Sequence, residues 1–264
     1  MFFDPTYLLC VALPTLLLMG ATSWYVKAAY NKWSKVRATS GLTGAQAAQQ
    51  LISRSVYSGI EGADGLRDVR VMGIGGSLSD HYDPRDKTLR LSPGVANVPS
   101  VAAVAVAAHE LGHAMQDSEG YLPMKLRSAL VPAVNIGSNL GWILIIVGLL
   151  FNWTGLAWAG VIAFSAGALF ALATLPVEFN ASARAKRLLA ESGIVQTDEE
   201  IRGVNNVLNA AALTYVAGLI TAVLQLLYYV MLVSGMGGSR VKGSCAQRMR
   251  GHSCGWWRQV LPLT

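Results

Sequence analysis

The stretch "AAHELGHAMQ", residues 107–116, places two histidines four residues apart, with a glutamate directly after the first. On a helix, residues four apart lie on the same face, so the imidazoles of His109 and His113 can converge on one cation. Glu110 lies about 100° further round the helix, where its carboxylate can face a water molecule instead of the cation. Zinc accepts imidazole nitrogen and keeps one position open for water when a protein supplies three ligands. The pattern therefore predicts one catalytic Zn²⁺ per chain, with Glu110 as general base.

A third protein ligand is needed, because two histidines are too few for a catalytic zinc. Glu178 is the stronger candidate: it follows Pro176 and opens "EFNASARAKRLLAES", a predicted helix ended by Gly193. At that place a glutamate would also complement the helix dipole. Glu119, six residues after the second histidine, is the alternative, but ligation at that spacing needs a glycine where this chain has Gln116. We therefore expect Glu178 to complete the site.

The composition indicates a membrane protein. Hydrophobic residues make up 53% of the chain and charged residues only 14%, whereas about a quarter of a soluble chain is charged. Four apolar runs approach or exceed the length of about 20 residues that a spanning helix needs: 7–26, 133–151, 154–175 and 210–233. Only Asn152 and Trp153 separate the middle two, which predicts a tight helical hairpin. The predicted fold class is a mainly α, multi-pass membrane protein with about four transmembrane helices and a small α+β metalloprotease-like domain.

The distribution of charge predicts an orientation. The first run lacks the preceding positive charge of a cleavable signal peptide, since the only early charge is Asp4, and basic residues follow it: Lys27, Lys32, Lys35 and Arg37. The positive-inside rule then places the N-terminus outside and the catalytic face in the cytosol, at a prokaryotic plasma membrane. A second basic group agrees with this: Arg184, Lys186 and Arg187. Four spans would put a last group outside, against the rule: Arg240, Lys242, Arg248 and Arg250.

These patterns divide the chain into six predicted segments. They are an N-terminal transmembrane helix at 1–27, a cytosolic zinc-protease-like region at 28–131, a transmembrane hairpin at 132–176, cytosolic helices with the third ligand at 177–209, a C-terminal transmembrane helix at 210–234, and an unpatterned basic tail at 235–264.

Local signals predict the elements of the region before the hairpin. Thr43 and Gln46 form a capping box for a helix to about Ser55. Two short strands are expected from Asp68 and from Lys87, with the turn-rich stretch 73–86 between them. An alanine-rich helix carrying the histidines begins after the N-cap Ser100. The expected order is helix, two strands, metal helix.

The expected partners are a peptide or protein substrate and the lipid bilayer. The net charge of +6 comes largely from residues beside the apolar runs, which suits an anionic lipid surface. We find no nucleic-acid motif, and three cysteines imply no disulfide framework. The sequence does not specify an oligomeric state.

Four separate blocks of the chain resemble the YugP-type membrane zinc metallopeptidases, a gluzincin-like family with the His-Glu-x-x-His motif. The blocks are "LSDHYDPRDKTLRLS", "VAAHELGHAMQ", "LPVEFNASARA" and "AALTYVAGLITAVLQLLYY". The pattern Glu-x-x-Ala that begins at Glu178 resembles, more distantly, a motif of the HtpX-like membrane proteases. That motif continues with Asp where this chain has Ser182. A carboxylate there would orient a histidine, so Asn180 or Ser182 is expected to replace it through a weaker hydrogen bond.

The resemblance and the site chemistry together imply a zinc metallopeptidase that hydrolyses peptide bonds with a metal-activated water. An oxyanion stabiliser is also wanted, and the polar candidates are His81, Tyr82 and Arg184. If the edge of the strand at 88–92 is open, a substrate backbone could add to it, which would suit membrane-associated or unfolded segments. The alternative function is a non-enzymatic membrane adaptor or chaperone with a structural metal or none. Structural zinc sites usually have four ligands, mostly cysteine, and no cysteine lies near the motif.

Overall fold

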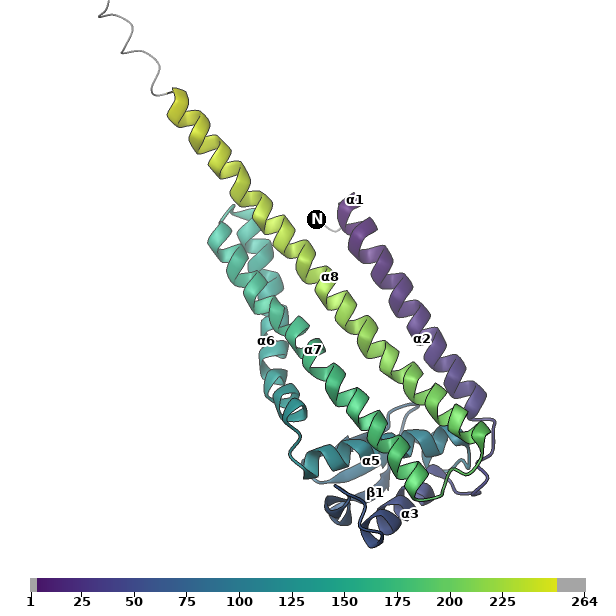
Figure 1. Ribbon diagram of the computed structural model, residues 1–264. Coiled ribbons are helices and arrows are strands. Elements are labelled where there is room, and N and C mark those ends of the chain that lie inside the picture. The colour runs from purple at the N-terminus through teal and green to yellow at the C-terminus, as the bar shows by residue number, and fades with distance from the viewer. Residues whose placement is uncertain (1–3, 251–264) are drawn as a thin grey trace, which may run out of the picture.

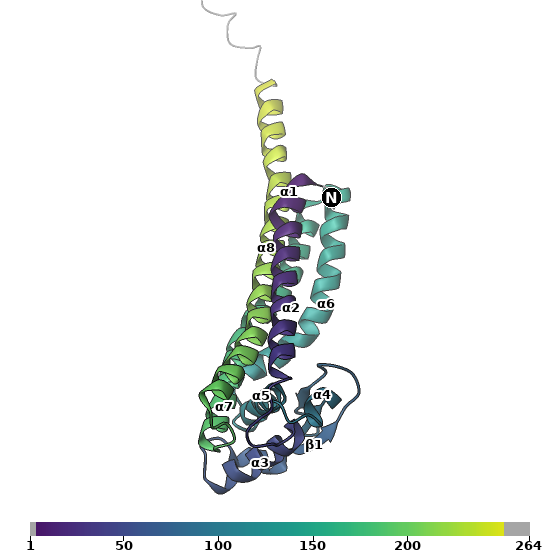
Figure 2. The ribbon, with the colours of Figure 1, turned by 90° about the vertical axis from the view of Figure 1, so that its right-hand side faces the viewer.

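Four helices that are long and apolar enough to cross a membrane run side by side above a smaller α+β region (Figures 1 and 2). The computed structural model describes residues 4–250. The first helix comprises α1 (Pro5–Tyr7), the π-helical turn η1 (Leu8–Ala12) and α2 (Leu13–Trp33), and the others are α6 (Leu122–Leu150), α7 (Thr154–Glu191) and α8 (Asp198–Arg250). The predicted fold class is confirmed. Of the predicted tail at 235–264, residues 251–264 lie outside the described residues.

Small residues let the hairpin helices α6 and α7 pack closely. A Cβ on Gly148 would come within 2.5 Å of the backbone nitrogen of Ala157, and one on Gly160 within 2.6 Å of the nitrogen of Ile145. Such small residues are the usual contact of membrane helices, because lipid supplies no hydrophobic drive for association. The hairpin helices are therefore in close backbone contact, and α7 continues from them down into the α+β region.

The α+β region is built on a three-stranded sheet. Its elements are α3 (Gly44–Tyr57), the 3₁₀ turn η2 (Asp64–Asp68), β1 (Arg70–Gly73), β2 (His81–Asp83), β3 (Thr88–Leu91), α4 (Pro93–Ala96) and α5 (Val101–Ser118). The capping box of Thr43 and Gln46 is present, and the hydroxyl of Ser100 accepts a hydrogen bond from the Ala103 N–H at 3.2 Å, so both predicted helix starts are confirmed. The strand order is β1-β3-β2, with β1 parallel and β2 antiparallel to β3.

The prediction of only two strands is wrong. His81–Asp83, expected as part of a turn, forms β2 and pairs with β3. With only three residues, β2 is too short to show the alternating pattern of a strand. An ion pair at 3.0 Å between Asp83 and Arg90 links β2 to β3. Because β3 lies between β1 and β2, neither of its edges is open, so the condition for adding a substrate strand to it is not met.

The expected separate helix after Pro176 is part of a longer one. α7 runs without a break from Thr154 to Glu191 and contains Pro176 in its interior. Proline is tolerated inside membrane helices, because neighbouring groups can satisfy the backbone that it disturbs. Glu178 therefore lies in the interior of a helix. The prediction that it complements the dipole at the start of a helix is wrong.

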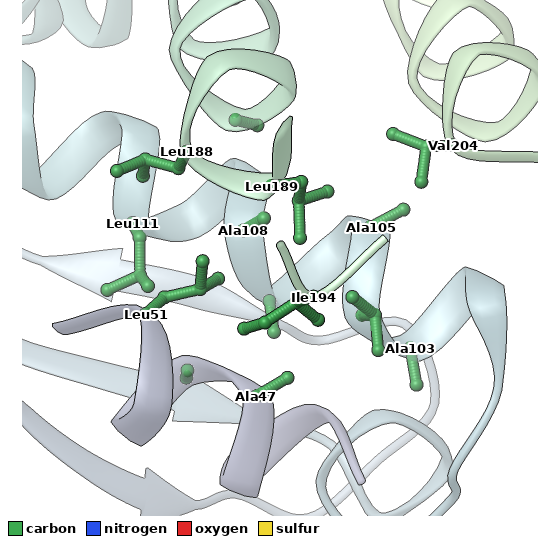
Figure 3. Close-up of a cluster of buried hydrophobic side chains, with 14 of the residues drawn as sticks. Ala47, Leu51, Ala103, Ala105, Ala108, Leu111, Leu188, Leu189, Ile194 and Val204 are labelled. Carbon is green, nitrogen blue, oxygen red and sulfur yellow. The ribbon is translucent and has the colours of Figure 1, made fainter. Parts of the chain in front are cut away.

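The helix α5 lies in the core of the α+β region (Figure 3). Alanines cover much of its surface, so neighbouring helices can approach its backbone closely. The residues around it come from α3, α7, the turn after α7 and α8: Ala47, Leu51, Leu188, Leu189, Ile194 and Val204. This packing fixes α5 against the lower half of α7, where Glu178 lies.

Candidate metal centre

Three side chains from two helices converge at the contact between α5 and α7. His109 and His113 lie one turn apart on α5, and Glu178 faces them from α7. Their candidate ligand atoms all lie within 4.8 Å of one another. The Oε2 atom of Glu178 is 3.3 Å from Nε2 of His109 and 3.6 Å from Nε2 of His113. The structure thus brings together the three residues that the sequence predicted as metal ligands.

The surroundings of Glu178 fit a bound cation. Its side chain is only 3% exposed, and its Oε1 atom accepts a hydrogen bond from Arg127 at 3.2 Å. Within the described residues its Oε2 atom is buried without a hydrogen-bond partner, although the two imidazole nitrogens face it. A buried carboxylate oxygen without a partner is costly. A cation between this oxygen and the two nitrogens would satisfy all three, and two imidazoles with one carboxylate form a known catalytic zinc set with an open position.

Gly112 permits this convergence. A Cβ at residue 112 would overlap the carbonyl oxygen of Ala181 and come within 3.1 Å of its Cα atom. The backbones of α5 and α7 are therefore in direct contact one turn from Glu178. The glycine inside the His-Glu-x-x-His motif sets the distance between the two helices, and with it the distance between the ligands.

Glu110 lies beside the ligand group but is not part of it. Its side chain is buried, and its Oε2 atom accepts a hydrogen bond at 3.0 Å from the backbone N–H of Tyr82 on β2. Burial raises the pKa of this carboxyl above its usual value. A carboxylate of raised pKa that lies next to a metal site is suited to accept a proton.

The outer ring nitrogens of both histidines have polar neighbours. Nδ1 of His109 is 3.2 Å from the hydroxyl of Ser182, and Nδ1 of His113 is 3.0 Å from Oε1 of Gln116. Among the described residues, Asn180 forms no hydrogen bond with a histidine, and its Oδ1 atom accepts one from Gln116. Ser182 thus occupies the place behind His109 that the sequence suggested. Gln116 takes the same place behind His113. In the sequence it was noted only because it stands where ligation by Glu119 would need a glycine.

Comparisons with known proteins identify the family of the chain. Residues 7–234 fit the family described as "Putative neutral zinc metallopeptidase". The chain belongs to this family. It is 42% identical over 221 residues to the "Putative membrane protease YugP" of Bacillus subtilis (strain 168), over 83% of this chain and 94% of that protein. No solved structure matches the chain. The resemblance noted in the sequence is confirmed.

The residues of this chain that the sequence suggested as oxyanion stabilisers have other contacts. His81 is exposed, with Nδ1 2.8 Å from the carbonyl oxygen of Ser79, and the Tyr82 hydroxyl donates to Asp117 at 2.9 Å. Burial is the main cause that raises the pKa of Tyr82, and the hydrogen bond to Asp117 adds to it. Tyr82 reaches the site through its backbone N–H, which bonds to Glu110.

Arg184 and Glu119 form an ion pair at the end of α5. The guanidinium donates two hydrogen bonds of 2.6 Å to the carboxylate, and its hydrogen bonds lower the pKa of Glu119. Glu119 does not belong to the metal-ligand group of the described residues. The structure therefore favours Glu178 over Glu119 as the third ligand.

The sequence analysis missed Arg127. It lies near the start of α6, donates to Glu178, and packs its guanidinium 5.9 Å from the ring centroid of Phe170 on α7. A cation just before an apolar run looks like an ordinary flanking charge in the sequence. Only the packing of α6 on α7 shows that it faces the candidate metal ligand Glu178.

Proposed function

We propose that this protein is a membrane-bound, zinc-dependent endopeptidase that holds one Zn²⁺ with His109, His113 and Glu178. One observation carries the proposal: a buried carboxylate oxygen without a partner faces two imidazole nitrogens at 3.3 and 3.6 Å. The family and the relative named above support it. The charge pattern supports an active face in the cytosol, and the bacterial relative supports a prokaryotic plasma membrane.

Glu110 moves the proton in the proposed hydrolysis. A bound zinc ion would supply Lewis acidity, which lowers the pKa of a water molecule and polarises the substrate carbonyl. Glu110 accepts a proton from the attacking water as the water oxygen bonds to the carbonyl carbon. It then delivers this proton to the amide nitrogen as the C–N bond breaks. Burial, which raises the pKa of Glu110 in the metal-free protein, favours the first of these steps, because it makes the carboxylate a stronger base.

The position of the site supports substrates at the membrane surface. Glu178 lies on the same continuous helix as the apolar run that crosses the membrane, and Arg127 links it to the start of α6. The site is thus at the foot of the spanning helices (Figure 1). We infer that it acts on membrane-associated or unfolded protein segments.

The test measures zinc per protein and hydrolysis of an unfolded model protein by the detergent-purified chain. The wild type, Glu110→Gln and Glu119→Ala should hold about one zinc each, whereas Glu178→Ala should lose it, since a three-ligand site would keep only two ligands. Glu110→Gln should lose hydrolysis while it keeps the metal. Absence of zinc from the wild type, or zinc that is unaffected by Glu178→Ala, would contradict the proposal and favour the adaptor or chaperone function.

A further inference from the structure

A chain of hydrogen bonds leads from His113 to the surface of the protein. Nδ1 of His113 is 3.0 Å from Oε1 of Gln116, and Nε2 of Gln116 donates to Oδ1 of Asn180 at 2.9 Å. The same Oδ1 atom accepts from Nε of Arg184 at 2.7 Å, and Arg184 forms the ion pair with Glu119. The chain joins α5 to α7 twice, through Gln116 and through Glu119.

The partners of Gln116 fix the orientation of its amide. Its side chain is fully buried, and Nε2 also lies 2.8 Å from the backbone carbonyl oxygen of Val177, which can only accept a hydrogen bond. The orientation of Asn180 is fixed as well, because Arg184 can only donate and so must face Oδ1. Both N–H groups of Gln116 are therefore used by acceptors on α7, and Oε1 is the atom that faces His113.

An acceptor at this place determines the tautomer of the histidine. A neutral imidazole carries its proton on one nitrogen only. Because Oε1 of Gln116 accepts, Nδ1 of His113 must carry the proton, and Nε2 keeps its lone pair. Nε2 is the atom that faces Glu178. The hydroxyl of Ser182 beside His109 can donate or accept, so it does not impose a tautomer in the same way.

We propose that Gln116 is a positioning residue that holds His113 in the tautomer whose Nε2 binds the metal. Asn180, Arg184 and Glu119 hold Gln116 in this orientation. Partners of this kind fix the ring and raise the basicity of a metal-binding histidine. The inference rests on the proposed function for the identity of the metal, and it assigns a role to a residue outside the ligand set.

The first test reads the tautomer directly in metal-free protein. The chain has four histidines, so the nitrogen signals of ¹⁵N-histidine-labelled protein can be assigned with a His113→Ala variant. At alkaline pH, where imidazole is neutral, His113 should show a single tautomer with the proton on Nδ1 in Glu178→Ala protein, in which no carboxylate faces Nε2. Gln116→Met removes the acceptor at nearly constant volume and should abolish this preference. A proton on Nε2 of His113 in the Glu178→Ala protein would overturn the inference.

The second test measures zinc affinity by competition with a chelator. Gln116→Met should bind zinc about 10–100-fold more weakly than the wild type, the usual effect of losing such a partner. The matched control is Gln46→Met. It also removes a glutamine that bonds to the chain, at the capping box of α3, and should leave zinc affinity and the tautomer unchanged. A purely structural role would lower the thermal stability of both variants and move neither readout.

The outcomes separate the two proposals. A wild type that binds no zinc contradicts the proposed function, and the tautomer of the metal-free protein still decides the role of Gln116. A wild type that binds zinc, with Gln116→Met binding it equally well, overturns only the inference about Gln116.

Discussion

Two buried glutamates of one site, Glu110 and Glu178, have different surroundings that suit different roles. Glu178 faces two imidazoles and a guanidinium, so positive or metal-binding groups surround its carboxylate. Glu110 has only the backbone N–H of Tyr82 as hydrogen-bond partner among the described residues. The first arrangement is suited to a permanent carboxylate that binds a cation. The second leaves a carboxyl whose proton can come and go.

This difference predicts that Glu110→Gln stabilises the metal-free protein at neutral pH. Burial raises the pKa of Glu110 in the folded state, so the folded state binds more protons than the unfolded state between the two pKa values. The free energy of unfolding then falls as pH rises through this window. The loss of stability from ionising the buried carboxyl is complete above the folded-state pKa. Removing the charge should raise the free energy of unfolding by about 0.5–2 kcal/mol, the size that single stabilising substitutions commonly have.

Chemical denaturation of metal-free wild type and Glu110→Gln at several pH values measures this effect. The difference should shrink as pH falls toward the ordinary carboxyl pKa of about 4.3. Glu61→Gln, at a glutamate whose side chain is 90% exposed, is the control and should show little difference at any pH. A Glu110→Gln protein that is less stable at neutral pH would contradict the argument.

The ligands could be predicted from the sequence because their chemistry depends on spacing. His109 and His113 are four apart on one helix, which fixes their relative place without any knowledge of the fold. Glu178 could be inferred because the hairpin returns the chain to the same side of the membrane. Gln116 and Arg127 could not be assigned roles, since their partners lie on α7, 61 and 51 residues away in sequence.

At the scale of elements, the contact of α5 with α7 decides whether the site exists. Gly112 lies against the backbone of Ala181, where no side chain fits. An added methyl group must push the helices apart or distort them, and overpacking of this kind costs about 1–3 kcal/mol. Both consequences would move Glu178 away from the two histidines.

Gly112→Ala is therefore expected to lower zinc affinity at least tenfold and to destabilise the protein by about 1–3 kcal/mol. Chelator competition and thermal unfolding measure the two effects. Gly218→Ala is the matched control, because this glycine also lies in a helix and a Cβ there meets no atom within 4 Å. Equal zinc affinity in the Gly112→Ala and Gly218→Ala proteins would show that the close contact is not needed.

The elements that the sequence predicted well are those with local signals. The caps at Thr43 and Ser100 fixed the starts of α3 and α5 because the capping side chain and its partner lie within three residues. β2 was missed because its pairing with β3 is the only sign of a strand in three residues. The unbroken course of α7 through Pro176 was missed because the packing around a membrane helix, and not its own sequence, compensates for the proline.

At the scale of the whole molecule, the spanning helices and the candidate metal centre share two helices, α6 and α7. α7 crosses the apolar region and supplies Glu178, and α6 crosses it and supplies Arg127. The side of the membrane on which the site lies therefore depends on the orientation of the hairpin. The turn between α6 and α7, around Phe151, must lie on the opposite side from the α+β region.

The positive-inside pattern predicts that the α+β region faces the cytosol. Single cysteines test this in a chain whose natural cysteines have been replaced. Asp64→Cys is placed in η2, where the side chain is 88% exposed, and Phe151→Cys in the hairpin turn, where the side chain is 77% exposed. In intact cells an impermeant thiol reagent should label Phe151→Cys and not Asp64→Cys. In inside-out vesicles the pattern should reverse, and retained zinc would show that both variants are folded. Labelling of Asp64→Cys from outside the cell would place the metal centre on the outer face, and the substrates would then be segments exposed outside the cytosol.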